Sequence, residues 1–151
     1  ISNLIIWFPI IWNNRYWDYD YLIRIMRFQM LKMADFFESD NTVSRDIENN
    51  AKRIRTVIKL MDKVYEEDYA FEYLDQIEDL YGKRKFESYP VENNPQLKKL
   101  SIEYTNDYSN EELKRIDKHE KELFLKSHEK QEKAHRILWK MIEQNIRKWW
   151  D

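Results

Sequence analysis

The stretch from Ser109 to Asp151 constrains the fold most, because it contains neither proline nor glycine. Ser109 and Glu112 match a capping box, in which each of the two side chains binds a free backbone N–H at the start of a helix. A single helix of about 40 residues would be roughly 60 Å long at ~1.5 Å per residue. The other elements must therefore pack along this helix or leave part of it bare.

This predicted helix divides into two parts by composition. Apolar residues are sparse from Leu113 to Lys133, but they recur at helical spacing from Ala134 to Trp149. We expect the second part to join a helical bundle. The first part has three alternatives: it projects into solvent, pairs with another chain as a coiled coil, or carries an insertion. The positions that would form the seam of a coiled coil are more polar than such seams usually are, which argues against the second alternative.

The composition indicates a mainly α protein. One glycine and three prolines among 151 residues leave little material for turns, and 42% hydrophobic with 36% charged residues is typical of a folded, non-membrane chain. The length predicts a single helical domain, residues 1–151. The net charge of -2 argues against binding to nucleic acid. The absence of cysteine excludes disulfides, thiolate nucleophiles and cysteine-based metal sites, and fits a reducing cytosol.

Three further helices are predicted from apolar residues at steps of three and four, which gives an antiparallel bundle. They begin at 18 or 20, at 42 or 44, and at 69, and they end at 37, 67 and 81. Asp18 or Asp20 suits the first N-cap. Gly82 follows the third helix, where a left-handed residue is expected.

Residues 83–108 form an insertion of different character. Apolar and polar residues alternate over 86–91 and over 100–104, and the turn-forming residues 92–95 lie between them. This pattern predicts a small β-hairpin near 85–104. Two strands alone are marginally stable, so we expect the hairpin to lie against helices.

Residues 1–12 form an apolar N-terminal arm. The arm is shorter than the ~20 residues that span a bilayer, and it lacks the basic start of a signal peptide. Pro9 predicts a short helical turn followed by extended chain. We expect the arm to lie across the helices. The alternatives are peripheral membrane contact and the end of a truncated helix.

Candidate catalytic and metal sites are weak. His128, Glu132 and His135 share one helix face and contain the E-x-x-H spacing of di-iron bundles. The predicted helices that would face them supply no second histidine, so we interpret the triplet as exposed polar residues and predict neither metal nor cofactor. Glycine-flanked serines and phosphate-binding glycine loops are missing. An enzyme is therefore not predicted.

Aromatic and arginine side chains are the best candidates for ligand or partner contact, because rings stack and guanidinium groups pair with phosphate or carboxylate. The candidates are Trp12, Arg15, Trp17, Tyr21, Arg24, Arg27, Trp149 and Trp150. The alternative is that the rings close one end of the bundle and the arginines pair with acids. Trp149 and Trp150 point about 100° apart on a helix, so we expect one to pack inward and the other to be exposed.

Several short motifs resemble small helical proteins encoded by tailed bacteriophages. They are Phe8 to Asn13, Trp17-Asp18, Tyr21-Leu22, Arg27-Phe28, 58–62, 67–69 and the final Trp149-Trp150-Asp151. The resemblance implies the cytoplasm of an infected bacterium as the setting. It carries no activity and no functional residues.

Three functional hypotheses follow. The first is a phage accessory protein that binds a host protein, such as a defence component, or a second copy of itself through aromatic-rich helical surfaces; it predicts an exposed patch of Trp and Tyr. The second is a sponge for a nucleotide-like signal, with arginines converging in a concave site between residues 12 and 27. The third is a metal-dependent helical-bundle enzyme, with His128, Glu132 and His135 facing acids of another helix.

Overall fold

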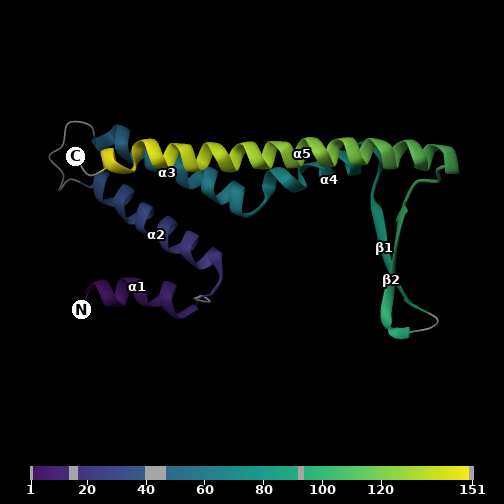
Figure 1. Ribbon diagram of the computed structural model, residues 1–151, viewed down its shortest axis with the longest axis horizontal. Coiled ribbons are helices and arrows are strands. Elements are labelled where there is room, and N and C mark those ends of the chain that lie inside the picture. Colours follow the sequence, from purple (N-terminus) through teal and green to yellow (C-terminus); the bar gives the residue numbers. More distant parts are fainter. Residues whose placement is uncertain (1, 14–16, 40–46, 92–93, 150–151) are drawn as a thin grey trace. The chain divides into compact units, whose positions relative to one another are not determined.

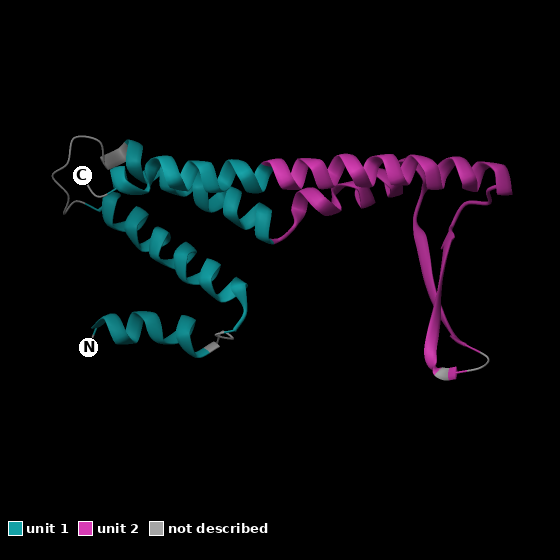
Figure 2. Cartoon of the chain, viewed as in Figure 1, with its two compact units in different colours: residues 1–65, 134–151 teal, residues 66–133 magenta. Residues whose placement is uncertain are grey.

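The computed structural model describes residues 2–13, 17–39, 47–91 and 94–149. Over these residues the chain is mainly helical, with a two-stranded antiparallel sheet and a long C-terminal helix, which confirms the predicted fold class (Figure 1). The chain forms two compact units, residues 1–65 with 134–151 (unit 1) and residues 66–133 (unit 2) (Figure 2). The single-domain organisation of residues 1–151 stays a prediction.

Unit 1 begins with three helices, α1 (Ser2–Asn13), α2 (Tyr19–Phe37) and α3 (Ile47–Tyr65). Asp18 is the N-cap of α2, and its carboxylate accepts a hydrogen bond of 3.1 Å from the backbone N–H of Asp20. The predicted start of the second helix at residue 42 or 44 lies outside the described residues.

The N-terminal arm is a continuous helix, although Pro9 lies inside it. The prediction of a short turn followed by extended chain is therefore wrong. Proline cannot donate to the carbonyl four residues earlier, so α1 loses a hydrogen bond. Packing offsets this loss, because Trp7 of α1 meets Phe28 of α2 edge to face, with ring centroids 5.0 Å apart.

The core of unit 1 consists of apolar side chains from α2, α3 and the C-terminal part of the chain. Its buried members are Ile23, Met30, Ala34, Ala51, Ile54, Val57, Ile58, Met61, Val64, Ala134, Leu138, Ile142 and Trp149. Arg55 of α3 reaches back to the end of α2, where it pairs with Asp35 and Glu38 at 2.7 Å each. The hydrogen bond from Arg55 lowers the pKa of the Glu38 carboxyl.

Unit 2 contains α4 (Asp68–Tyr81) and the hairpin strands β1 (Arg84–Val91) and β2 (Asn94–Tyr104). Gly82 ends α4 with a positive φ of 87°, as a glycine position predicts, but its ψ of 174° is extended rather than left-handed helical. A Cβ here would lie 2.7 Å from Nδ2 at the end of the Asn106 side chain, so a larger residue would displace that side chain.

The long helix α5 (Asn110–Asn145) begins with the predicted capping box. The backbone N–H of Ser109 donates to Glu112 Oε2 at 2.8 Å, and the backbone N–H of Glu112 donates to Ser109 Oγ at 3.3 Å. The α-helix ends at Asn145 and tightens into a 3-10 turn, η1 (Ile146–Trp149). The stretch after Ser109 is therefore a single α-helix only as far as Asn145.

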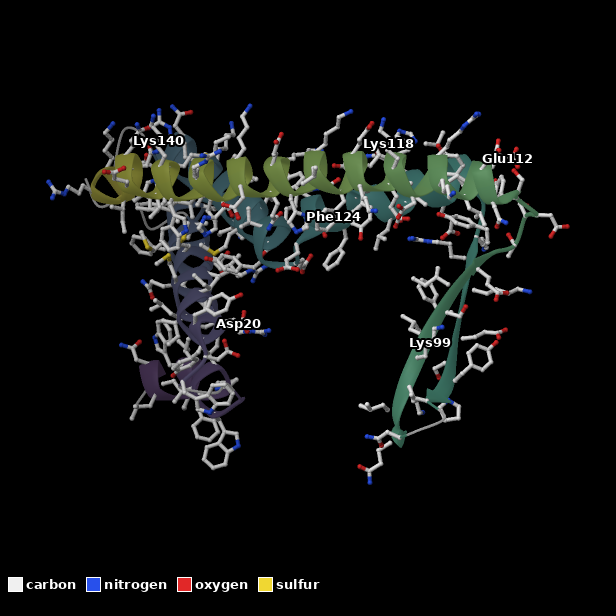
Figure 3. The ribbon with its side chains drawn as sticks, turned by 45° about the vertical axis from the view of Figure 1, so that its right-hand side comes forward. Asp20, Lys99, Glu112, Lys118, Phe124 and Lys140 are labelled. Atoms are coloured by element: carbon white, nitrogen blue, oxygen red, sulfur yellow. The ribbon has the colours of Figure 1, made fainter. Side chains whose placement is uncertain are left out.

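The first part of α5 belongs to unit 2, which ends at Lys133, where the composition changes. Phe124 lies on the side of α5 that faces α4 (Figure 3), and its ring meets Tyr73 edge to face at 5.4 Å. Lys130 pairs with Glu72 of α4 at 2.5 Å. Of the three alternatives for this segment, the contacts of the described residues agree with a helix that carries the insertion.

Candidate binding surfaces

The rings of the predicted N-terminal site are mostly exposed. Phe8 and Trp12 stack with ring centroids 5.3 Å apart, and both are exposed, as is Trp17. Tyr21 is half-buried, and Arg15 lies outside the described residues. None of the helices in the described residues combines the length and apolarity that a membrane crossing requires.

The two described arginines of this predicted site each bind a carboxylate. Arg24 pairs with Asp20 one turn earlier on α2. Arg27 forms a two-pronged pair with Asp62 of α3, in which NH2 donates to Oδ2 at 2.9 Å. The two guanidinium groups thus serve different carboxylates and do not converge in one concave site.

Trp149 is fully buried, whereas Trp150 lies outside the described residues. Trp149 helps to line a cavity of about 280 Å³ together with Gln29, Lys32, Met33, Phe36 and Phe37. Its indole Nε1 is buried and has no hydrogen-bond partner. Nearly all of the cavity wall is apolar, so the cavity lacks the convergent polar groups of a nucleotide site.

The histidines of the metal candidate contact aromatic rings. His128 lies against Phe124 with ring centroids 4.1 Å apart, and His135 Nε2 accepts a hydrogen bond of 3.0 Å from Trp139 Nε1. Among the described residues, no group of three or more histidine, aspartate or glutamate side chains could hold a metal ion. His128, Glu132 and His135 are all exposed.

The hairpin carries the surface that sequence reasoning missed. The strands pair in register from Arg84 opposite Tyr104 to Pro90 opposite Lys98. Directly opposed residues share a face, and alternate pairs lie on opposite faces. One face, here called the apolar hairpin face, therefore consists mainly of Phe86, Pro90, Leu100 and Ile102, with Ser88 between them and Lys98 opposite Pro90.

This apolar hairpin face is exposed along its length. Phe86 is 61% exposed, Leu100 59% and Ile102 49%. The prediction that the hairpin lies against helices is therefore wrong beyond its base. The opposite face is polar, with Lys85 opposite Glu103 and Lys99 opposite Tyr89; the side chains along both strands, Lys99 among them, extend from the ribbon in Figure 3.

A polar and aromatic cluster fixes the base of the hairpin to α5. Arg84 NH1 of β1 pairs with Glu120 Oε1 of α5 at 2.7 Å, and both side chains are largely buried. The Tyr81 hydroxyl lies 2.7 Å from His119 Nδ1. Tyr108 donates its hydroxyl to the carbonyl of Tyr81 at 2.9 Å. These contacts hold the end of α4 and both strand ends against one helix.

Tyr104 completes this cluster at the end of β2. Its ring meets Tyr108 edge to face at 5.7 Å, and its hydroxyl is buried without a hydrogen-bond partner. Burial raises the pKa of Tyr104, and the nearby charge of Glu120 raises it further. The cluster therefore positions the hairpin, and the raised pKa keeps the Tyr104 hydroxyl protonated at neutral pH.

Signals for this surface existed in the sequence. The alternation over 86–91 and 100–104 places the apolar residues on one face once the register is known, but the alternation alone does not fix the register. Comparison with protein-family models, with curated proteins and with solved structures found no match.

Proposed function

We propose that this protein is a non-enzymatic binding protein that holds another protein on its apolar hairpin face. The observation that carries the proposal is the exposure of Phe86, Leu100 and Ile102 on one side of a hairpin that, among the described residues, contacts α5 through Arg84 at its base. Isolated two-stranded hairpins are marginally stable until one face is packed. A partner that covers the face would supply this packing.

The two faces of the hairpin support a protein partner. One side offers aliphatic and aromatic groups, and the other offers Lys85, Glu103 and Lys99, which remain suited to water. Sheet faces of this kind pack against another sheet or helix. Burial of a large apolar side chain contributes about 1.5–3 kcal/mol when it is complete. Three half-exposed side chains can thus supply several kcal/mol toward the cost of association.

The resemblance to phage proteins makes a bacterial host protein the first partner class to test, and a second copy of the chain the next. The nucleotide sponge receives no support from Arg24 and Arg27, because each already pairs with a carboxylate. Protein binding is therefore the proposed function, with the hairpin rather than the helices as its contact surface.

Site-specific photocrosslinking tests this proposal. A photoreactive phenylalanine at position 100 lies on the apolar hairpin face, and one at position 99 lies on the opposite face of the same strand. In the producing cell we expect an adduct of defined mass from position 100 and much less from position 99. The mass separates a host protein from a second copy.

Two outcomes would refute the proposal. One is the absence of adducts from position 100, and the other is equal yields of the same adducts from positions 99 and 100. A crosslinker in place of Leu125, which has similar exposure on α5, controls for adducts with any exposed apolar position.

A further inference from the structure

The outward face of α1 is apolar, in contrast to an ordinary surface helix. Trp7 and Ile10 are half-buried, and Trp7 packs on Phe28 of α2. At 100° per residue, the side of α1 away from Trp7 presents Ile5, Phe8, Pro9 and Trp12. Ile5 is 68% exposed, Phe8 56% and Trp12 74%.

A helix that packs on a protein normally turns its polar side outward. Here residues 2–13 contain no charged side chain, and their only polar residues, Ser2, Asn3 and Asn13, stand at the two ends. In the middle of α1, the only side-chain groups that can hydrogen-bond to water are the indole N–H groups of Trp12 and of the half-buried Trp7. The side of this helix away from Trp7 is therefore apolar, like the side that packs on α2.

The chemistry of this face fits lipid better than protein. Protein interfaces are about 56–65% apolar and include polar rims and roughly ten hydrogen bonds. The outward face of α1 has no such groups. Trp12 and, at the start of α2, Trp17 and Tyr19 are exposed rings with one polar atom each. Such rings are enriched where a membrane's apolar region meets water.

We propose that the outward face of α1 inserts into the apolar region of a lipid bilayer. Ile5 and Phe8 enter the acyl chains, and Trp12 and Trp17 lie at the boundary with the headgroups. The absence of charge in residues 2–13 means that the binding depends on apolar contact. It therefore needs no anionic lipid and changes little with salt.

Flotation of the full chain with phosphatidylcholine vesicles tests this proposal. We expect the protein to float with the vesicles equally at low and high salt. Ile5→Asp should lower the partition coefficient at least tenfold, because it places a charge in the inserted face. Leu125→Asp, at a position of similar exposure on α5, should leave the coefficient unchanged.

Quenching by brominated acyl chains gives a second readout. We expect quenching of the wild-type tryptophan fluorescence, less quenching in Trp12→Phe, in which Trp17 still reports, and unchanged quenching in Trp139→Phe, since Trp139 lies on α5. Failure to float, or equal effects of Ile5→Asp and Leu125→Asp, would overturn the proposal. A wild-type oligomer in vesicle-free buffer that Ile5→Asp dissociates would also overturn it, because a second copy would then cover α1.

Discussion

Removal of the Glu120 carboxylate should release the hairpin from α5. Arg84 NH1 lies 2.7 Å from Glu120 Oε1, and the two side chains are 11% and 27% exposed. In a Glu120→Ala variant the guanidinium group keeps its charge and its burial but loses its carboxylate. The end of β1 can then regain solvation for Arg84 only by moving away from the helix.

The expected cost follows from the burial of the pair. An exposed ion pair contributes about 0–1 kcal/mol, whereas an unpaired charge in a fully buried site costs about 3–5 kcal/mol. Because the Arg84 side chain is closer to the fully buried case, we expect Glu120→Ala to cost about 2 kcal/mol of hairpin stability, a value between these two ranges. That free energy corresponds to roughly a 30-fold larger opening equilibrium of the hairpin.

Native-state hydrogen exchange measures this opening directly. The amide of Thr105 donates to the carbonyl of Lys83 at 2.8 Å and closes the base of the hairpin. We expect its protection to fall about 30-fold in Glu120→Ala, in line with the ~2 kcal/mol cost. The amides of α3 should keep their protection from exchange.

Asp117→Ala is the matched control. It breaks the pair with Lys121 on the same helix, in which the two side chains are 71% and 64% exposed. We expect little change in the exchange of Thr105. Equal protection in both variants, or a loss of protection that extends to α3, would refute the assignment of Arg84 and Glu120 as the hairpin anchor.

Three further predictions concern stability and ionisation. Trp149→Ala should lower the free energy of unfolding, measured in urea, by about 3–5 kcal/mol, because the ring is fully buried. Ile146→Ala, at an exposed position, should lower it much less, and equal losses would contradict the packing of Trp149. Tyr104→Phe should raise the stability by about 1 kcal/mol at neutral pH, since it removes a buried hydroxyl without a partner. Because burial penalises the ionised form of Tyr104, its raised pKa makes the stability fall as the pH rises from ~10 through the folded pKa. This decrease should be smaller in Tyr104→Phe, and a decrease of unchanged size would argue against this assignment. The side-chain hydrogen bond from Ser109 lowers the pKa of Glu112, so the ionised Glu112 stabilises the fold above its ordinary pKa, and this stabilisation is lost as the pH falls through the folded pKa. In Ser109→Ala the pKa of Glu112, measured by NMR titration, should rise. An unchanged pKa would contradict this cause.

Local features of the fold could be predicted from the sequence because their partners are close along the chain. The capping box of Ser109 and Glu112 spans three residues, and the carboxylate of Asp18 caps its own helix. The hairpin follows from alternation and turn residues. Gly82 was correctly expected to have a positive φ, although its ψ is extended.

Features that depend on distant partners could not be predicted in this way. Tyr81 meets His119 and Arg84 meets Glu120 across gaps of 38 and 36 residues, and no local pattern pairs them. Pro9 was expected to end a helix, but the contact of Trp7 with α2 supports the helix through it. The burial of Trp149 depends on a 3-10 turn that changes the helical phase from Ile146 onward.

Covering of the apolar hairpin face in the cell is the central claim, and hydroxyl-radical footprinting tests it most directly. The oxidation of Phe86, Leu100 and Ile102 would be compared between the purified chain and the chain in its producing cell, with Tyr89 of the opposite face as internal reference. We predict that oxidation of the three apolar residues falls severalfold in the cell while that of Tyr89 is unchanged. Equal oxidation of all three residues in both settings would contradict a bound partner.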